Sequence, residues 1–266
     1  MEAATAALKA EGIGLEDLTG IVCHTTTPPL NTPSMACMLL NQLDPTGKAE
    51  PMVYDVNAAC SGWLYALDAA HNTIQHNPDS AVLVVTTECL SRLVNPEDFG
   101  TAILFGDAAT ATVMRGVVDG EQPPAGSMLL SQPVLAGKAD PGGILQVGFE
   151  GRGHITMDGK RVFTEAVRAM TKMTNQAFER SGAALDDLQW LVPHQANERI
   201  FEAVRQRLKI PDEKIVNLIR NHGNTSSSSI PLSISKSEHL FKPRDIVGVC
   251  AFGGGFTFGA AILEIV

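Results

Sequence analysis

The chain has 266 residues, 44% of them hydrophobic, and a formal charge of −9. This length is enough for one large domain or two smaller ones, each with a substantial core. The acidic balance, without a patch of basic and aromatic residues, argues against general nucleic-acid binding. The five cysteines lie far apart and include no C-x-x-C pair, so we expect neither a disulfide framework nor a metal site.

The sequence contains no apolar run long enough to cross a bilayer and no recognisable signal peptide. We therefore expect no membrane partner, and the unpaired cysteines favour the reducing cytoplasm. The 24 glycines and the low aromatic content of 5% favour an α/β protein in which helices and strands approach closely.

The first predicted elements occur twice in the chain. A pattern of glycine, leucine, aspartate, valine and histidine at residues 12–24 recurs 170 residues later, at 182–194. Each copy predicts a helix, a glycine stop, a short turn and a buried strand. At this offset Met1 aligns with Thr171, so the first half begins in mid-helix. We expect either a truncated or renumbered chain, or a neighbouring chain or rearranged terminus that fills the vacant place in the sheet.

Residues 55–67 predict a buried strand, a turn of small residues and a buried helix, with Cys60 in the turn. The thiol would then lie at or near a helix N-terminus, where free N–H groups and the helix dipole favour a thiolate. Its small neighbours leave room for a substrate. Cys60 is thus a candidate nucleophile; the alternative is a small buried residue, which is the commoner role of a free cysteine.

The repeat continues in weaker form beyond Cys60. Residues 57–61 resemble 224–228 as a helix start rich in small side chains. Each half therefore alternates strands and helices, as layered α/β folds do. We predict two related halves, residues 1–120 with the cysteine and residues 121–266.

Three polar or glycine-rich positions in the second half could act with Cys60. His194 follows a predicted strand, at the end where α/β proteins usually place catalysts, but its positional twin His24 is a caution, since a lone histidine is more often structural. Asn224 begins a predicted helix, either as an N-cap or as an amide donor in a pocket. Three glycines at 253–255 indicate a close approach of the main chain to another group, and an N–H there could serve an oxyanion hole.

Four motifs, in this order, resemble those of the β-ketoacyl-acyl-carrier-protein synthase III family of the thiolase superfamily. They are Asn-Ala-Ala-Cys-Ser-Gly at 57–62, Pro-His-Gln-Ala-Asn at 193–197, His-Gly-Asn-Thr-Ser at 222–226 and Phe-Gly-Gly-Gly-Phe-Thr at 252–257. The resemblance covers nearly the whole chain from residue 2 onward. It implies a duplicated five-layer α-β-α-β-α fold in a homodimer, with the N-terminal strand region missing here.

The resemblance also implies a chemistry, a decarboxylating Claisen condensation. Cys60 would carry the acyl group, and His194 and Asn224 would bind the thioester carbonyl of a malonyl group on acyl carrier protein. Backbone N–H groups of Cys60 and Gly254 would form the oxyanion hole. Two neutral donors suit this reaction because they stabilise an enolate without protonating its carbon. No cofactor or metal is implied; the substrates would be acyl-coenzyme A or acyl carrier protein, and malonyl carrier protein.

Family motifs further suggest that Gln195 and Arg199 bind the acyl carrier protein. Thr32 stands where many members have a bulky phenylalanine that reaches the partner's acyl pocket, which predicts a longer acyl chain. Phe99 stands where members place an arginine against coenzyme A, which counts against the usual acetyl-coenzyme A primer. Two alternatives stay open: an acyltransferase to an oxygen or nitrogen nucleophile, and a non-catalytic subunit of a heteromeric condensing complex.

Overall fold

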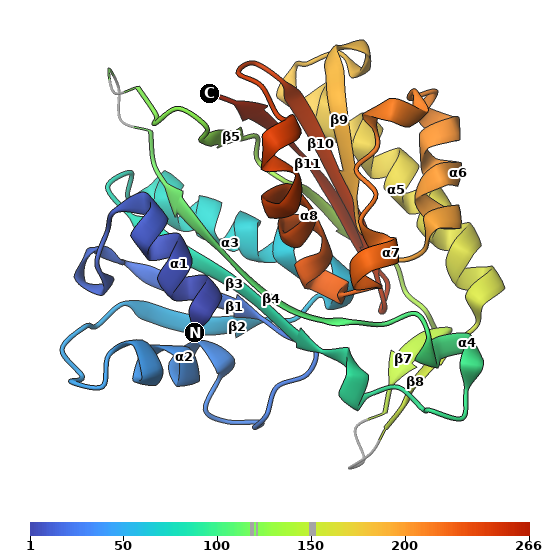
Figure 1. The fold of residues 1–266 in the computed structure, drawn as a ribbon, viewed down its shortest axis with the longest axis horizontal. Coiled ribbons are helices and arrows are strands. Elements are labelled where there is room, and N and C mark those ends of the chain that lie inside the picture. Colours follow the sequence, from blue (N-terminus) through green and yellow to red (C-terminus); the bar gives the residue numbers. More distant parts are fainter. Residues whose placement is uncertain (118–119, 121, 149–152) are drawn as a thin grey trace.

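The computed structural model describes residues 1–117, 120, 122–148 and 153–266, which form two β-sheets and the helices around them (Figure 1). The first sheet has the order β2-β1-β3-β4, with β1 parallel to β2 and β3, and β4 antiparallel to β3. These strands are β1 (Gly20–His24), β2 (Met52–Val56), β3 (Ala81–Cys89) and β4 (Asp107–Arg115).

The second sheet has the order β5-β11-β10-β9, and β6 also pairs with β11. Its central strands β10 and β11 are antiparallel, whereas β9 and β10 are parallel. The strands are β5 (Met128–Leu130), β6 (Val134–Gly137), β9 (Leu188–Pro193), β10 (Ile246–Gly253) and β11 (Thr257–Ile265). A small hairpin, β7 (Leu145–Val147) and β8 (Ile155–Met157), lies apart from both sheets.

Three apolar clusters join these sheets and the longer helices into five layers (Figure 1). Helices α1 (Glu2–Glu11) and α2 (Met35–Leu43) pack on the outer face of the first sheet. Helices α3 (Gly62–His76) and α8 (Ser229–Ser237) lie between the sheets, and α5 (Gly159–Ser181) and α6 (Glu198–Leu208) cover the outer face of the second. The predicted α-β-α-β-α fold is therefore confirmed. Two short helices complete the set, α4 (Phe99–Ala102) and α7 (Ile219–His222).

The 170-residue repeat is visible in local geometry. Helices α1 and α5 end at Gly12 and Gly182, which have φ angles of 72° and 77°; such left-handed backbone favours glycine. A single turn follows each glycine, closed by Asp17 in one copy and Asp187 in the other, whose carboxylates accept backbone N–H groups three residues earlier. Strands β1 and β9 then begin. Helix, glycine stop, turn and strand therefore occur twice, as predicted.

The same layering explains the apolar strands. Seven of the nine residues of β3, and nearly all of β10 and β11, are buried, because helices cover both faces of each sheet. All described strands of the first sheet lie within residues 1–120, and those of the second lie within 121–266. Among the described helices, none is both long and apolar enough to cross a membrane.

Candidate active site

Cys60 lies in a tight turn between β2 and α3, in the middle of the molecule. Ala59 before it has a φ of 47°, a conformation that residues with a Cβ rarely adopt. The Ala58 carbonyl accepts bonds from Ser61 N (3.1 Å) and Thr257 Oγ1 (2.6 Å). A Cβ at Gly253 would lie only 2.7 Å from Cys60 N. The first of the three glycines therefore lets one backbone approach another, as expected.

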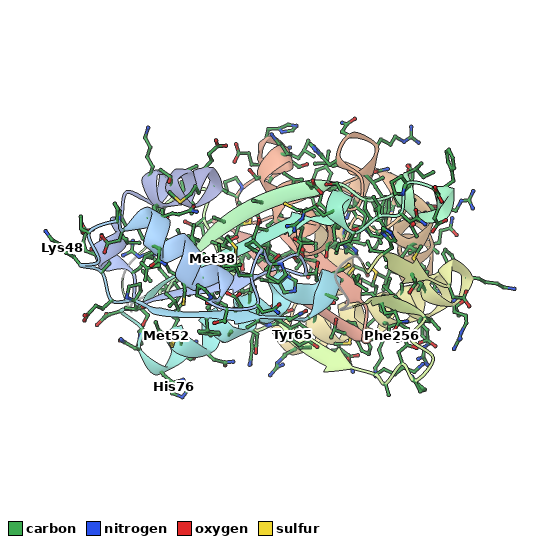
Figure 2. All side chains as sticks on the ribbon, turned by 90° about the horizontal axis from the view of Figure 1, so that it is seen from below. Met38, Lys48, Met52, Tyr65, His76 and Phe256 are labelled. Carbon is green, nitrogen blue, oxygen red and sulfur yellow. The ribbon has the colours of Figure 1, made fainter. Side chains whose placement is uncertain are left out.

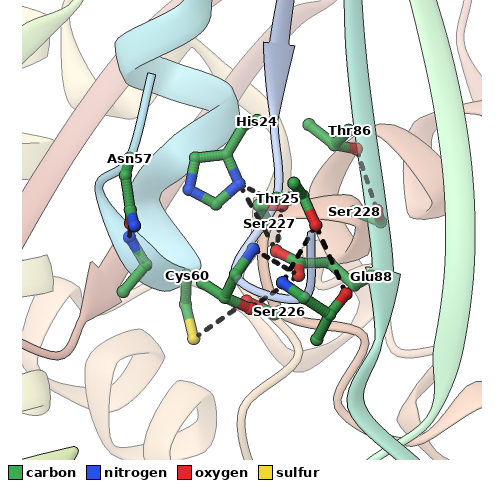
Figure 3. Close-up of polar contacts among 12 residues, drawn as sticks. His24, Thr25, Asn57, Cys60, Thr86, Glu88, Ser226, Ser227 and Ser228 are labelled. Carbon is green, nitrogen blue, oxygen red and sulfur yellow. Dashed lines mark hydrogen bonds and ion pairs between the residues drawn. The ribbon is translucent and has the colours of Figure 1, made fainter. Parts of the chain in front are cut away.

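A second turn, at residues 224–228, repeats this geometry in the other half. Ser226 has a φ of 51°, matching Ala59, 167 residues earlier in the chain. The Oδ1 atom of Asn224 accepts the Ser226 N–H at 2.9 Å, and the corresponding atom of Asn57 accepts the Ala59 N–H at 3.3 Å. Ser226 Oγ donates to Cys60 Sγ at 3.4 Å (Figure 3). The two duplicated turns are thus in direct contact.

Asn224 is held so that its side-chain NH2 group is left to donate. It is 7% exposed, and its backbone bonds the segment before β4, with N donating to Leu104 O (2.7 Å) and O accepting from Gly106 N (3.0 Å). Because Oδ1 already accepts a bond from Ser226, the Nδ2 hydrogens remain for a ligand.

His194 lies directly after β9 and is 1% exposed. Its Nδ1 is 2.6 Å from Ser229 Oγ, which also accepts the Gln195 N–H at 3.2 Å. Ser229 is the first residue of α8, so the helix that follows the Asn224 turn also orients this histidine. Burial lowers the pKa of His194 to about 4, although the nearby Glu88 charge acts in the opposite direction. The imidazole is therefore neutral at pH 7.

Cys60 is also neutral in the resting site. Burial raises the pKa of its thiol to about 11; the Ser226 hydrogen bond lowers it, and the Glu88 charge adds to the increase. The expectation of a thiolate at the helix N-terminus is therefore wrong for the resting protein. The reason is that loss of solvation outweighs the favourable helix end. Two neutral groups, a thiol and an imidazole, face the same segment of residues 224–229.

The structure places the other predicted residues as follows. Gly254 lies in the turn between β10 and β11, and its N–H has no acceptor within the described residues. A Cβ there would lie 2.9 Å from Leu145 O, so this position also requires glycine. Its part in an oxyanion hole stays a prediction. Thr32 is exposed in the loop before α2, and Phe99 is exposed on α4.

The two residues predicted to bind a carrier protein differ. Arg199 is exposed in the first turn of α6 and is available to a partner. Gln195 is 2% exposed. Its side-chain amide donates to Pro193 O and Val216 O and accepts from Leu218 N. These three bonds fix the loop around His194, so the expectation that Gln195 contacts a partner is corrected.

Glu88, a buried carboxylate in the middle of the molecule, is a site residue that was not predicted from the sequence. It is 1% exposed and accepts bonds from Thr26 N (2.9 Å), Thr26 Oγ1 (2.6 Å) and Ser227 Oγ (2.6 Å). Burial would raise its pKa, but the nearby His24 ring and the hydrogen bonds from Ser227 and Thr26 together hold the pKa below its usual value. The available signal was a carboxylate near the end of an otherwise apolar strand. No cluster of potential metal ligands occurs among the residues whose structure is described.

Comparison with known proteins identifies a family for this chain. A model of 3-oxoacyl-[acyl-carrier-protein] synthase III matches residues 54–131, and a model of the C-terminal part of the same enzymes matches 178–265. The β-ketoacyl-[acyl-carrier-protein] synthase III of Oleidesulfovibrio alaskensis is 37% identical over 279 aligned residues, which cover 99% of this chain and 82% of that protein.

Solved structures agree with the sequence match. The 3-oxoacyl-[acyl-carrier-protein] synthase III of Aquifex aeolicus superimposes with a TM-score of 0.88 at 35% identity, covering 98% of this chain and 82% of that one. The priming β-ketosynthase of the R1128 polyketide pathway gives 0.87 at 27% identity, covering 99% and 80%.

The low pKa of His194 predicts a pH-dependent stability. The pKa of this histidine is near its ordinary value of 6.5 in the unfolded chain and about 4 in the folded chain, so stability is lost as pH falls through that window. From pH 7 to 5 the contribution is about 2 kcal/mol. Urea unfolding at both pH values measures it. We expect the free energy of unfolding lost between pH 7 and 5 to be smaller by about this amount in His194→Gln. Equal losses in the two proteins would contradict the lowered pKa of His194.

Proposed function

The chain belongs to the 3-oxoacyl-[acyl-carrier-protein] synthase III family of condensing acyltransferases, and from this premise we propose that it joins an acyl group to malonyl-acyl carrier protein in fatty acid or related biosynthesis. One observation carries the proposal: the turn with Cys60 contacts the turn with Asn224 through Ser226. The helix that begins at the end of the second turn also holds His194. The segment of residues 224–229 therefore connects the nucleophile to both neutral donors.

In the first step Cys60 takes the acyl group from its thioester donor. Its sulfur forms a bond to the acyl carbonyl carbon, the bond from that carbon to the donor sulfur breaks, and the thiol proton goes to the departing thiolate. The N–H groups of Cys60 and Gly254 stabilise the oxyanion of the tetrahedral intermediate. The close approach of Gly253 to Cys60 N supports this pairing, because it brings the glycine turn against the nucleophile turn.

In the second step His194 and Asn224 bind the thioester carbonyl of the malonyl group. The Ser226 N–H orients the Asn224 amide by bonding Oδ1, so the Nδ2 hydrogens are left to donate to this carbonyl. We assign the single ring proton of neutral His194 to Nε2, since Ser229 accepts the Gln195 N–H and can donate its own hydroxyl proton to Nδ1. Carbon dioxide leaves as the carbon–carbon bond breaks, and its electron pair is delocalised onto the carbonyl oxygen as an enolate. Each such donor contributes about 2.7–4 kcal/mol to barrier reduction.

The enolate carbon then attacks the acyl carbonyl on Cys60. A carbon–carbon bond forms, the carbon–sulfur bond breaks, and the β-ketoacyl product leaves on the carrier protein. The sulfur departs as a thiolate in a site where burial favours the thiol, so it takes up a proton from solvent and the resting state returns.

Arg199 supports the carrier protein as partner. Acyl carrier protein is acidic, whereas this chain has a charge of −9, so docking requires a local cation. Two neighbouring cations are compensated, with Arg205 paired to Glu202 and Arg220 to Glu198. Arg199 is exposed at the start of α6, close along the chain to His194.

A second copy of the chain is the other partner we propose, along the edge of β2. In the described part of the chain this strand pairs only with β1, and Met52 on it is 46% exposed. Met52 and His76 border a shallow hollow beside the strand (Figure 2). At the strand's other end the Asp55 carboxylate binds Met35 N and Ala36 N (2.6 and 2.8 Å). The Thr32 loop is thereby tied to this edge, where it can reach the partner's acyl pocket.

The proposed chemistry predicts one covalent adduct and two separable steps. Incubation with a panel of acyl thioesters should add one acyl mass, mapped by peptide digestion to Cys60 and absent in Cys60→Ala. Malonyl-acyl carrier protein should then release it as a β-ketoacyl product. His194→Ala and Asn224→Ala should still acylate but condense about 10²–10³-fold more slowly, because each lacks one enolate donor.

Cys89→Ala, which alters an exposed cysteine, is the matched control and should behave like the unchanged protein. Failure of every thioester to acylate Cys60 would contradict the proposal and favour a non-catalytic subunit. Acyl turnover to an oxygen or nitrogen acceptor without malonyl carrier protein would instead identify the related acyltransferase.

Arg199→Glu tests docking separately. Reversing a rim charge mainly slows association with a charged partner, so we expect KM for malonyl-acyl carrier protein to rise about tenfold at low salt while acylation from a small acyl thioester is unchanged. Arg207→Glu makes the same charge change in the last turn of α6, where the residue is also exposed. Equal effects of the two substitutions would show that net charge, and not a docking residue, is responsible.

A further inference from the structure

We propose that His24 is a positioning residue for Cys60, held by Glu88 through Ser227 so that its imidazole accepts the Ala58 N–H and fixes the nucleophile turn. This inference rests on the proposed function, because it assigns His24 a role in presenting the Cys60 thiol. It concerns groups that the proposed chemistry does not use: a buried histidine, a buried carboxylate and a buried hydroxyl.

His24 is placed directly against the nucleophile turn. It is the last residue of β1 and is 0% exposed. Its Nε2 accepts the Ala58 N–H at 3.2 Å, two residues before Cys60. A Cβ at Gly62, the first residue of α3, would overlap the imidazole ring. The ring therefore touches the turn both before and after the cysteine.

The hydrogen atoms in this cluster can be assigned from the contacts alone. Ser227 Oγ lies 2.6 Å from Glu88 Oε1 and 2.9 Å from His24 Nδ1 (Figure 3). A carboxylate only accepts, so the Ser227 proton goes to Glu88. Ser227 Oγ must then accept a proton from His24 Nδ1. The neutral Nδ1–H tautomer leaves Nε2 unprotonated, which is the state that the Ala58 N–H requires.

Glu88 supports the assignment of the His24 proton to Nδ1, because it is held as a charged acceptor. Its two oxygens receive three hydrogen bonds, two from Thr26 and one from Ser227, and Oε1 lies 3.4 Å from His24 Nδ1. These donors stabilise the charged form of a carboxylate that burial would otherwise neutralise. The charge orients Ser227, Ser227 orients His24, and His24 orients the Ala58 N–H.

The duplication shows how the two histidines diverged. Residues 57–62 correspond to 224–229, so Gly62 corresponds to Ser229. In the second half the Ser229 hydroxyl contacts His194 Nδ1. In the first half the missing side chain of Gly62 makes room for the His24 ring. His24 therefore packs under its own turn, and it crosses to the opposite half for its partner Ser227.

The backbone that His24 holds is strained and needs such support. Ala59 has a φ of 47°, and Ala58, which precedes it, is only 4% exposed. Without an acceptor the Ala58 N–H would be buried and unpaired, so the turn would rearrange to satisfy it. Cys60 would move with it, and small displacements of a reacting group cause large losses of rate.

Two substitutions test the two ring nitrogens of His24 separately. The amide of His24→Asn can replace the Nδ1–H donor to Ser227 but does not reach Ala58, whereas the amide oxygen of His24→Gln can replace the Nε2 acceptor. Amide hydrogen exchange of the peptide containing Ala58, and the single-turnover rate of Cys60 acylation measured by intact mass, are compared in both variants.

We expect the Ala58 amide of His24→Asn to lose its protection against hydrogen exchange. The maximal single-turnover rate of acylation should fall on the order of 10²-fold, while the thioester concentration that gives half of this rate stays unchanged. His24→Gln should recover protection and most of the rate. Ser227→Ala cuts the link to Glu88 and leaves His24 in place, so it should lose part of the acylation rate. This variant provides the test if His24→Asn fails to fold. Thr174→Val removes a buried hydroxyl bonded within α5 and should leave acylation unchanged.

Three results would overturn the inference. The first is unchanged hydrogen exchange at Ala58 in His24→Asn, and the second is lost protection at Ala58 without slower acylation. The third is an equal loss of acylation rate in the Asn and Gln variants that follows the fall in their melting temperatures. Absence of acylation in the unsubstituted protein would refute the proposed function instead, and hydrogen exchange would still decide whether His24 holds Ala58.

Discussion

The contact between the two duplicated turns is the constraint on which the rest of the structure depends. Each turn begins a helix of the middle layer, and the Ser226 hydroxyl bonds the Cys60 sulfur where they meet. This contact is possible only because the residues that flank it are glycines, whose lack of a side chain lets the backbones come close. A Cβ at Gly253 would crowd Cys60 N, and one at Gly106 would overlap the His222 carbonyl beside Asn224. The five layers bring both turns to one place, and the glycines let them touch.

Electrostatically, the site consists of neutral groups around one buried charge. Burial keeps the pKa of Cys60 high and that of His194 low, so neither carries a charge at neutral pH. An enolate intermediate is better served by neutral donors than by an acid, which would quench its carbon. Glu88 keeps its charge because it lies on β3 where the loop after β1 and the Asn224 turn meet, and both of these segments donate hydrogen bonds to it, through Thr26 and Ser227.

Much of this could be predicted from the sequence, since the repeat and the four motifs are local patterns. The helix, glycine stop and strand of each half follow from short-range rules, and Cys60, His194 and Asn224 stand in segments whose composition marks a helix start or a strand end. Burial could not be predicted in the same way. Gln195 lies in a motif yet is buried, the thiol is neutral despite its helix, and the bonds of Glu88 to Thr26 and Ser227 span 62 and 139 residues. Such properties depend on which elements pack together.

The central claim is that Cys60, His194, Asn224 and the Gly254 N–H converge on one acyl group and its attacking enolate. A crystal structure of the protein acylated at Cys60 tests this most directly. We predict that the acyl carbonyl oxygen lies within hydrogen-bond distance of both Cys60 N and Gly254 N, with His194 Nε2 and Asn224 Nδ2 facing the space in front of the carbonyl carbon. An acyl carbonyl turned away from Gly254, or either side chain directed elsewhere, would contradict the account.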